Sequence, residues 1–290
     1  MIGAAAPHEL SLAGAELEAA ERVAALLAGT APLGVAFSGG VDSSTLLALA
    51  ARALGREQVL AILGVSPSLA AEERAAAHRV AAFVGVPVVE VETFEGDRAE
   101  YRRNGPDRCF HCKDELFGWI SDDVATRHGL AAVAYGENAD DARRPDRPGA
   151  AAASAYRVLR PLAEAGIDKA GVRRIARALR LPCADKPAAP CLASRIPHFQ
   201  EVLPEKLAQV EAAEAALRRL GFGDLRVRHH GEIARIELEP EDLPRAVAPP
   251  LRDDVLAAVR AAGFRFVALD LAGVQPGAFT LPLVEQRGTT

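Results

Sequence analysis

The sequence predicts an α/β protein in which a doubly wound parallel sheet is followed by a smaller C-terminal α+β domain. In the first half, short runs that are apolar throughout alternate with stretches whose apolar residues recur at helical spacing, which is typical of parallel βαβ units. In the last third, alternating strands are interspersed with helices. A length of 290 residues fits two domains. We expect these domains to cover residues 1–190 and 191–290.

Each element of the first domain follows from its residue pattern. Apolar runs predict strands at 33–37, 59–65, 86–91 and 131–135, and helical spacing predicts helices at 41–54, 70–84 and 112–128. Residues 136–157 are rich in Asp, Arg and Pro and end in an Ala tract, so we expect a long loop there. Asp168 is expected to cap a helix over 168–181, because Pro182 follows its end.

The proline-rich stretch 183–197 predicts no regular element, and we take it as the junction between the domains. Beyond it the pattern predicts helices at 204–220 and 253–262 and strands at 225–228, 233–238 and 264–269.

Composition limits the function classes. Half of the residues are hydrophobic and a quarter are charged, which excludes a disordered chain, and no apolar run approaches the ~20 residues of a membrane helix. A net charge of −5 argues against nucleic acid and anionic membranes as partners. The first thirty residues show no secretory signal, so we expect a cytoplasmic protein.

A glycine-rich loop, Ser38-Gly39-Gly40-Val41-Asp42-Ser43-Ser44, connects the first strand to the first long helix. Two glycines let backbone N–H groups approach an anion closely, and the helix N-terminus adds positive charge. The serines supply hydroxyl donors, and Asp42 suits a Mg²⁺ ion held against phosphates. A serine-capped turn without a ligand is the simpler alternative. The lack of Gly-Lys-Ser/Thr excludes a Walker A loop.

This string resembles the PP-loop of the N-type ATP pyrophosphatases, which activate a substrate by adenylation. The resemblance implies ATP and Mg²⁺ as cofactors, with the phosphates bound by Ser38, Gly39, Gly40, Asp42, Ser43 and Ser44. It also implies nucleotide contacts at the ends of neighbouring strands, near Ala36, Ser66, Gly136, Asn138 and Asp141. Asp141 also suits a structural turn.

Cysteines are the second chemical signal. Cys109 and Cys112 place two thiolates within reach of one metal or cluster. A redox pair is disfavoured because the two follow the third strand rather than open the first helix. Zinc is disfavoured because seven residues separate Cys183 from Cys191, rather than two to four. Two ordinary buried thiols remain an alternative. Lys186 and Arg195 lie near Cys191 in the sequence, which favours a thiolate there, and Cys183 receives no role.

Four strings together resemble one PP-loop family, the LarE sulfur transferases, which build the pincer nucleotide of the nickel cofactor used by lactate racemase. They are residues 38–44, Asp107-Arg108-Cys109-Phe110-His111-Cys112-Lys113, Gly136-Glu137-Asn138-Ala139-Asp140-Asp141, and Pro190-Cys191-Leu192-Ala193-Ser194-Arg195-Ile196-Pro197 leading into Glu205-Lys206-Leu207. They span about residues 31–240, and their combination is much more specific than any one of them.

The resemblance implies an enzyme that adenylates the carboxylate of a pyridinium mononucleotide and then converts it to a thiocarboxylate. A carboxylate is a poor electrophile, whereas its adenylate carries a leaving group that sulfur can displace. In some members the cysteine equivalent to Cys191 surrenders its own sulfur and becomes dehydroalanine. Others resemble three-cysteine proteins that hold a [4Fe-4S] cluster. Because this chain has Cys109, Cys112 and Cys191, we favour the cluster as sulfur carrier. A homo-oligomer is also expected, since family members resemble hexamers.

Arg226 and Arg228 alternate on a predicted strand, so both face one side, where paired guanidinium groups suit a phosphate. Alone, the pair fits a solvated edge strand better, and the family resemblance is what implies a substrate phosphate here. The same resemblance implies that Ser194 and Arg195 contact the substrate or intermediate. Glu214, Glu237 and Glu239 are weaker candidates, and the last two also suit a solvated strand face.

Three other functions stay open at this stage. A tRNA-thiolating PP-loop enzyme would need a basic surface, which the acidic chain does not predict. Amidation with ammonia, as in NAD synthetase, would leave the three cysteines without a task. A nucleotide-sensing or zinc-stabilised binding module would release no pyrophosphate.

Overall fold

The computed structural model describes residues 12–143 and 148–275, and their contacts divide the chain into two units. The first unit comprises the chain up to Ser66, Ala71–Glu95 and Cys109–Ala189. The second comprises Pro67–Ala70, Gly96–Arg108 and the chain from Pro190 on. The division of function between residues 1–190 and 191–290 stays a prediction.

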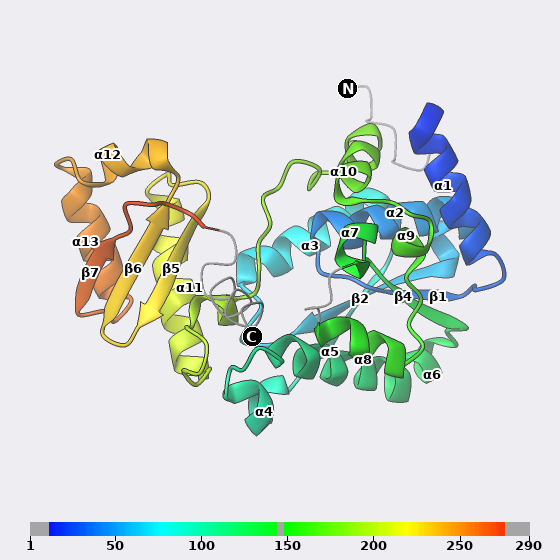
Figure 1. Ribbon diagram of the computed structural model, residues 1–290, viewed down its shortest axis with the longest axis horizontal. Helices are drawn as coiled ribbons and strands as arrows, with labels where there is room; N and C mark the ends of the chain where they lie inside the picture. Colours follow the sequence, from blue (N-terminus) through cyan, green and yellow to red (C-terminus); the bar gives the residue numbers. More distant parts are fainter. Residues whose placement is uncertain (1–11, 144–147, 276–290) are drawn as a thin grey trace, which may run out of the picture. The chain divides into compact units, whose positions relative to one another are not determined.

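A parallel sheet forms the centre of the first unit, with the strand order β3-β2-β1-β4 (Figure 1). The strands are β1 (Leu33–Ala36), β2 (Val59–Val65), β3 (Val88–Glu92) and β4 (Ala132–Tyr135). The central strand β1 pairs in parallel with β2 on one side and with β4 on the other. The strand order therefore reverses between β1 and β4. In open α/β sheets, ligands bind at the carboxyl ends of strands beside such a reversal.

Helices cover both faces of this sheet, which confirms the doubly wound α/β fold (Figure 1). On one face α2 (Val41–Leu54) packs against α1 (Gly14–Leu27), α3 (Ala71–Val84) and α10 (Lys169–Ala178). The other face is covered by α5 (Arg108–Trp119), the π-helical turn Ile120–Val124 and α8 (Pro148–Ala155). Phe117, Ile120 and Ala152 pack there against Ile62 and Tyr135 of the sheet. Asp168 caps α10 as expected, because its Oδ1 accepts a hydrogen bond from the Gly171 N–H at 2.7 Å.

The expectation of a loop over 136–157 is wrong. Leaving aside residues 144–147, which lie outside the described part, this stretch contains α7 (Ala139–Ala142) and α8. Asn138 caps α7 by accepting from the Asp141 N–H at 3.0 Å. The alanine tract forms α8 because alanine has the highest helix propensity, which outweighs the polar composition before it.

The helix expected at 112–128 starts earlier, at Arg108, and continues through the π-helical turn into α6 (Ala125–His128). Cys109 therefore lies in the first helical turn rather than in the preceding loop. Helix α1 was not expected, although its buried residues Ala19, Ala20, Val23 and Leu27 have helical spacing. The remaining short helices of this unit are Arg56–Gln58, Glu95–Asp97 and α9 (Pro161–Glu164).

The second unit contains the smaller α+β fold, built on a mixed sheet. Strand β5 (Leu225–His230) is antiparallel to β6 (Ile233–Leu238), and β6 is parallel to β7 (Phe266–Leu269). The helices are α4 (Ala99–Arg102), α11 (Pro204–Arg219), α12 (Leu243–Ala246) and α13 (Leu251–Ala261), with short 3₁₀ turns at Leu192–Arg195 and Pro240–Asp242. None of the helices in the described part of the chain is long and apolar enough to cross a membrane.

Asn104 joins two distant segments within the second unit. It is fully buried, and its φ of 56° lies in the left-handed region, which Asn tolerates better than most residues. Its Nδ2 donates to the carbonyls of Ile196 and Pro197 at 3.2 and 2.8 Å. Its Oδ1 accepts from Nη1 of Arg108, which also donates to the Ala193 carbonyl at 2.9 Å. Residues 96–108 therefore hold the proline-rich segment that carries Cys191.

Candidate active site

The glycine loop after β1 is fixed by close backbone contacts. Gly39 has a φ of +71°, and a Cβ there would lie 2.8 Å from Cα of Ala77, so only glycine fits. A Cβ on Gly136, at the end of β4, would lie 2.6 Å from the backbone N of Ser43. The end of β4 therefore packs directly against the first turn of α2.

Serine side chains brace the loop from within. The Ser43 hydroxyl donates to the Gly40 carbonyl at 3.2 Å and accepts from the Ser38 N–H at 3.2 Å. Gly40 occupies the N-cap position of α2 without a side-chain hydrogen bond to the helix end. The Ser38 hydroxyl also accepts from the Gly40 N–H at 3.4 Å, so serine hydroxyls close the turn and the simpler alternative of a serine-capped turn stays open. A 14-residue helix with this kind of N-terminus presents N–H groups and positive dipole charge to an anion.

Asp42, in the first turn of α2, belongs to a network of polar side chains. Its Oδ1 accepts from Nδ2 of Asn138 at 3.0 Å, and its Oδ2 is paired with the ammonium of Lys169. Asn138 also donates to Oδ2 of Asp141 at 2.9 Å. The backbone N–H of Lys169 donates to Asp140 at 2.9 Å. Asn138 thus orients two carboxylates, and carboxylate oxygens are the ligands that Mg²⁺ prefers.

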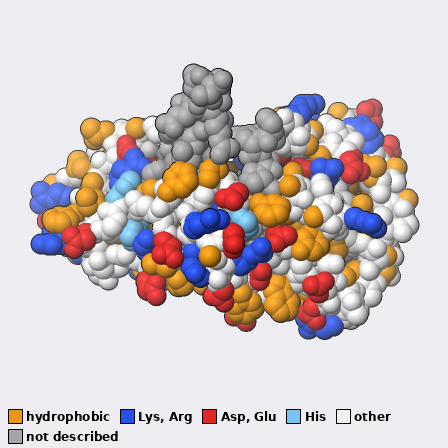
Figure 2. Space-filling view, turned by 60° about the horizontal axis from the view of Figure 1, so that its bottom comes forward, with side chains coloured by type: hydrophobic (Ala, Val, Ile, Leu, Met, Phe, Trp, Pro, Cys, Tyr) orange, Lys and Arg blue, Asp and Glu red, His pale blue; other side chains and the backbone are white. Residues whose placement is uncertain are grey.

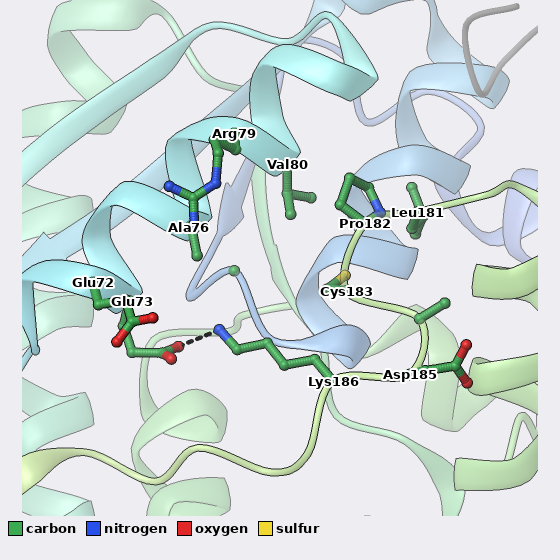
Figure 3. A pocket seen from close by; sticks show the side chains of 12 residues that line it. Glu72, Glu73, Ala76, Arg79, Val80, Leu181, Pro182, Cys183, Asp185 and Lys186 are labelled. Atoms are coloured by element: carbon green, nitrogen blue, oxygen red, sulfur yellow. Dashed lines mark hydrogen bonds and ion pairs between the residues drawn. The ribbon is translucent and has the colours of Figure 1, made fainter. Parts of the chain in front are cut away.

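A cavity of about 420 Å³ borders the back of the loop (Figure 3). It lies between α3, Gly39 and residues 181–186. Lys186 and Glu73 both line it and bind each other, with 2.6 Å between Nζ and Oε2. Burial raises the pKa of the Cys183 thiol. A buried thiol with a raised pKa is a poor nucleophile.

A second cavity, of about 260 Å³, lies at the carboxyl ends of β1 and β4, and we call it the nucleotide pocket. Seven of the residues that the sequence singled out line it: Ala36, Ser38, Gly40, Asp42, Ser43, Gly136 and Asp141. Tyr135 and Glu137, which flank Gly136 in the string where nucleotide contacts were expected, also line it. So do Phe37, Lys113, Leu116 and Phe117, for which no role was expected. The other four residues with an expected nucleotide contact, Gly39, Ser44, Ser66 and Asn138, are not among the lining residues. The Ser66 hydroxyl donates to the buried carboxylate of Glu95 at 2.6 Å.

Cys109 and Cys112 are three positions apart on α5, so they share one face of that helix. Lys113 and Leu116, which line the nucleotide pocket, lie on the same face, because they follow Cys109 and Cys112 by four positions. Cys109 is exposed and Cys112 is partly buried. Within the described residues, no group of three His, Cys, Asp or Glu side chains is arranged to hold a metal ion.

Cys191, in the second unit, is exposed and precedes the 3₁₀ turn Leu192–Arg195. Arg195 folds back around it, because its Nη1 donates to the Pro190 carbonyl at 2.6 Å and to Oγ of Ser194 at 2.9 Å. Nε of Arg195 donates to Oε1 of Glu214 at 2.8 Å, and Glu214 also accepts from the Val227 N–H at 3.0 Å. Glu214 therefore links the Cys191 loop to β5.

Arg226 and Arg228 are buried, with only 4% and 3% of their surface exposed, so they do not form a solvated strand face. Arg228 forms two hydrogen bonds with Glu237, which is also buried, whereas Glu239 lies exposed beyond the end of β6. Burial lowers the pKa of Arg226, and the charges of Arg228 and Arg195 lower it further. The three guanidinium groups thus lie close enough to repel one another, which an anion would relieve.

A backbone oxygen already contacts this group of arginines. The Gln275 carbonyl accepts from Arg226 at 3.0 Å and from Arg228 at 3.3 Å. The Ser194 carbonyl accepts from the other terminal nitrogen of Arg228 at 2.9 Å. No sequence pattern predicts a role for Gln275, because it acts through its backbone and lies 47 positions beyond Arg228.

Comparison with known proteins provides independent information. The sequence profile of a family described as asparagine synthase matches residues 16–133. An uncharacterized protein of Synechocystis is 42% identical over 84% of this chain and 90% of its own length. The pyridinium-3,5-bisthiocarboxylic acid mononucleotide synthase of Lactiplantibacillus plantarum is 35% identical over 84% of this chain and 87% of its own length. An uncharacterized protein of Methanocaldococcus jannaschii is 29% identical over 58% and 64% of the two chains.

Proposed function

Because the chain belongs to the LarE family of ATP-dependent sulfur transferases, we propose that it adenylates a pyridinium mononucleotide carboxylate and converts it to a thiocarboxylate. The substrate class comes from the name of the Lactiplantibacillus relative. One observation supports the reaction best: the face of α5 that lines the nucleotide pocket also carries Cys109 and Cys112. ATP activation and sulfur supply would then take place on adjacent parts of one helix.

In the first half-reaction, an oxygen of the substrate carboxylate attacks the α-phosphorus of ATP. The bond from that phosphorus to the bridging oxygen of the β-phosphate breaks, and pyrophosphate leaves with the electron pair. The N–H groups at the start of α2 bind the anionic phosphates, and Ser38 and Ser43 hold the loop in shape.

Asp42 and Asp141 are the residues that would hold Mg²⁺. A carboxylate has about four acceptor positions, so the bonds from Asn138 and Lys169 leave room on Asp42 for a metal ion. Their oxygen donors fit a hard cation. When bound, Mg²⁺ neutralises phosphate charge.

In the second half-reaction, sulfur attacks the acyl carbon of the adenylate, and AMP leaves with the electron pair of the broken C–O bond. We assign the sulfur supply to Cys109, Cys112 and Cys191. The raised pKa and the burial of Cys183 argue against its participation. Three thiolates would leave one iron of a [4Fe-4S] cluster open, and such a cluster would supply sulfide. The number of cysteines and the shared helix face of Cys109 and Cys112 support the cluster.

The buried arginines of the second unit suit the phosphate of the substrate mononucleotide. Arg226 and Arg228 face one side of β5, and both already bind an acceptor oxygen, the Gln275 carbonyl. Ser194 lies beside them through its carbonyl contact with Arg228. We propose that a phosphate oxygen replaces that carbonyl.

The tRNA-thiolating alternative has less support. On the face shown in Figure 2, Lys and Arg side chains are interspersed with Asp and Glu rather than gathered into one basic patch. A nucleic-acid site would need such a patch. Retention on immobilised tRNA that weakens with salt would favour this alternative.

Two variants separate the half-reactions. With ATP and the pyridinium acid, Cys191→Ser should still form pyrophosphate but no thiocarboxylate, whereas Asp42→Asn should lose both products. An amidating enzyme would tolerate Cys191→Ser completely. For the sulfur source, anaerobic purification should give about four irons and four sulfides per chain. Zinc without sulfide would refute the cluster, and dehydroalanine at position 191 after turnover would identify Cys191 as the donor.

A further inference from the structure

Lysine is rare in this chain. Among 34 basic residues there are only four lysines, Lys113, Lys169, Lys186 and Lys206, and all the others are arginines. An ammonium group is a compact point charge with three donors, whereas a guanidinium group is a rigid, planar fork. A chain that uses arginine almost everywhere is expected to keep lysine where the compact charge is needed.

Three of the four lysines lie around the glycine loop. Lys169 binds Asp42 in the first turn of α2. Lys186 binds Glu73 across the cavity that Gly39 borders (Figure 3). Lys113 lines the nucleotide pocket. The exception is Lys206, in the second unit, whose ammonium donates to the Glu201 carbonyl at 2.6 Å.

The side chain of Lys113 is held in place by its neighbours. Its ammonium lies 4.4 Å from the centre of the Tyr135 ring, which is a cation–π contact. A Cβ on Gly149 would lie 2.7 Å from Cδ and 3.0 Å from Nζ of Lys113, so the glycine in α8 leaves the space that this side chain fills. The ammonium is therefore oriented before any ligand binds.

The charges of the nucleotide pocket favour a cation beside the phosphates of ATP. Apart from Lys113, the charged residues that line it in the described part of the chain are acidic: Asp42, Glu137 and Asp141. ATP brings about four negative charges, and adenylation develops more charge on the oxygens around the α-phosphorus. Mg²⁺ on Asp42 would balance only part of it.

We propose that Lys113 is a catalytic residue of the adenylation step, a role that rests on the proposed function. Its ammonium binds a non-bridging oxygen of the α-phosphate while the substrate carboxylate attacks and pyrophosphate leaves. No proton moves, because the ammonium acts only as a charge and a hydrogen-bond donor. An ammonium group is a single point charge with rotatable donors, so it can keep its hydrogen bond to this oxygen while the phosphorus inverts. The planar guanidinium group of an arginine follows this movement less well.

The test compares Lys113→Met and Lys113→Arg with the matched control Lys206→Arg. Pyrophosphate release with ATP and the pyridinium acid is measured under steady-state conditions, and thermal unfolding checks that each variant folds. We expect kcat to fall about 100-fold or more in Lys113→Met and about 10-fold in Lys113→Arg. Lys206→Arg should match the parent chain. Parent-like kcat values in both Lys113 variants would overturn the proposal.

A second measurement keeps this inference separate from the proposed function. Binding of a non-hydrolysable ATP analogue with Mg²⁺ is followed by calorimetry, without any acid substrate. Lys113→Met should weaken this binding at least tenfold, even if the parent chain turns out to use another acid. Equal affinity in Lys113→Met and the parent chain would show that Lys113 does not touch the phosphates.

Discussion

Arg228 and Glu237 form a bidentate ion pair inside the second unit, with hydrogen bonds of 2.9 and 2.8 Å. Their side chains are only 3% and 1% exposed. Because Glu237 fixes two nitrogens of the guanidinium, Arg228 is oriented toward the Ser194 and Gln275 carbonyls before a phosphate arrives. Burying two charges costs desolvation free energy. Here the buried pair orients a group that is available to bind a phosphate.

Glu237→Gln should lower the free energy of unfolding by about 1–3 kcal/mol, because the buried charge of Arg228 loses its counter-charge. Urea unfolding measures the change. The control is Glu232→Gln, since the ion pair of Glu232 with Arg265 is exposed, and it should change stability by less than about 0.5 kcal/mol. Equal free energies of unfolding in the two variants would show that the buried ion pair does not stabilise the second unit.

Gly136→Ala should disrupt the nucleotide pocket, because the new methyl group would lie 2.6 Å from the Ser43 backbone nitrogen. Relieving this overlap costs about 1–3 kcal/mol, so ATP affinity should fall about 5- to 150-fold. Gly96→Ala is the matched control, since a Cβ there meets no atom within 4 Å. Calorimetry with ATP and Mg²⁺ makes the comparison, and parent-like affinity in Gly136→Ala would place the phosphates elsewhere.

The four thiols should react with iodoacetamide in a fixed order at neutral pH. Cys109 and Cys191 are exposed and should be labelled first, followed by Cys112. Cys183 should be labelled last, because burial both covers the thiol and raises its pKa. Peptide mass spectrometry against time gives the order, on protein freed of any metal. Labelling of Cys183 as fast as Cys191 would contradict its exclusion from the chemistry.

Stability should fall as the pH drops below about 6.5, partly through His229. Burial lowers the pKa of this imidazole, and the charge of Lys206 lowers it further. Its Nδ1 accepts from the Gly231 N–H at 3.3 Å, and its other ring nitrogen lies 3.2 Å from Oε1 of Gln209. The unfolded chain therefore takes up a proton first. The stability is fully present above the unfolded pKa and is lost as the pH falls toward the folded one.

The variant His229→Gln should flatten this dependence. The difference in Tm between pH 8 and pH 5.5 should shrink by about 2 °C or more relative to the parent chain. His128→Gln, at the end of α6, changes an exposed histidine and should leave the difference unchanged. His198 and His230 also have lowered pKa values, so some slope should remain. An unchanged slope in His229→Gln would mean that this imidazole does not stay neutral in the fold.

Local features of the fold could be predicted from the sequence. Strand β1, the glycine loop and helix α2 are consecutive, and each has its own pattern of apolar residues or glycines. Features that depend on distant residues could not be predicted. Lys169 binds Asp42 across 127 positions, and Asn104 binds carbonyls more than 90 positions away. Neither residue belongs to a pattern in its own segment.

The same distinction holds for the site. Arg226 and Arg228 could be paired by strand alternation, but their burial and the hydrogen bonds from Glu237 and Gln275 depend on the folded unit. Lys113 was visible in the string after Cys112. Its place in the nucleotide pocket depends on Tyr135 and Gly149, which lie on β4 and α8. The roles of all these residues in catalysis stay predictions.

The most direct test of the central claim, activation of an acid by ATP, is the product balance of one turnover. The parent chain, purified and assayed without oxygen, is mixed with ATP, Mg²⁺ and the pyridinium carboxylate mononucleotide, and AMP and pyrophosphate are quantified. We predict equal amounts of the two products, formed only when the acid is present. ADP and phosphate in their place, or no nucleotide cleavage at all, would contradict the account.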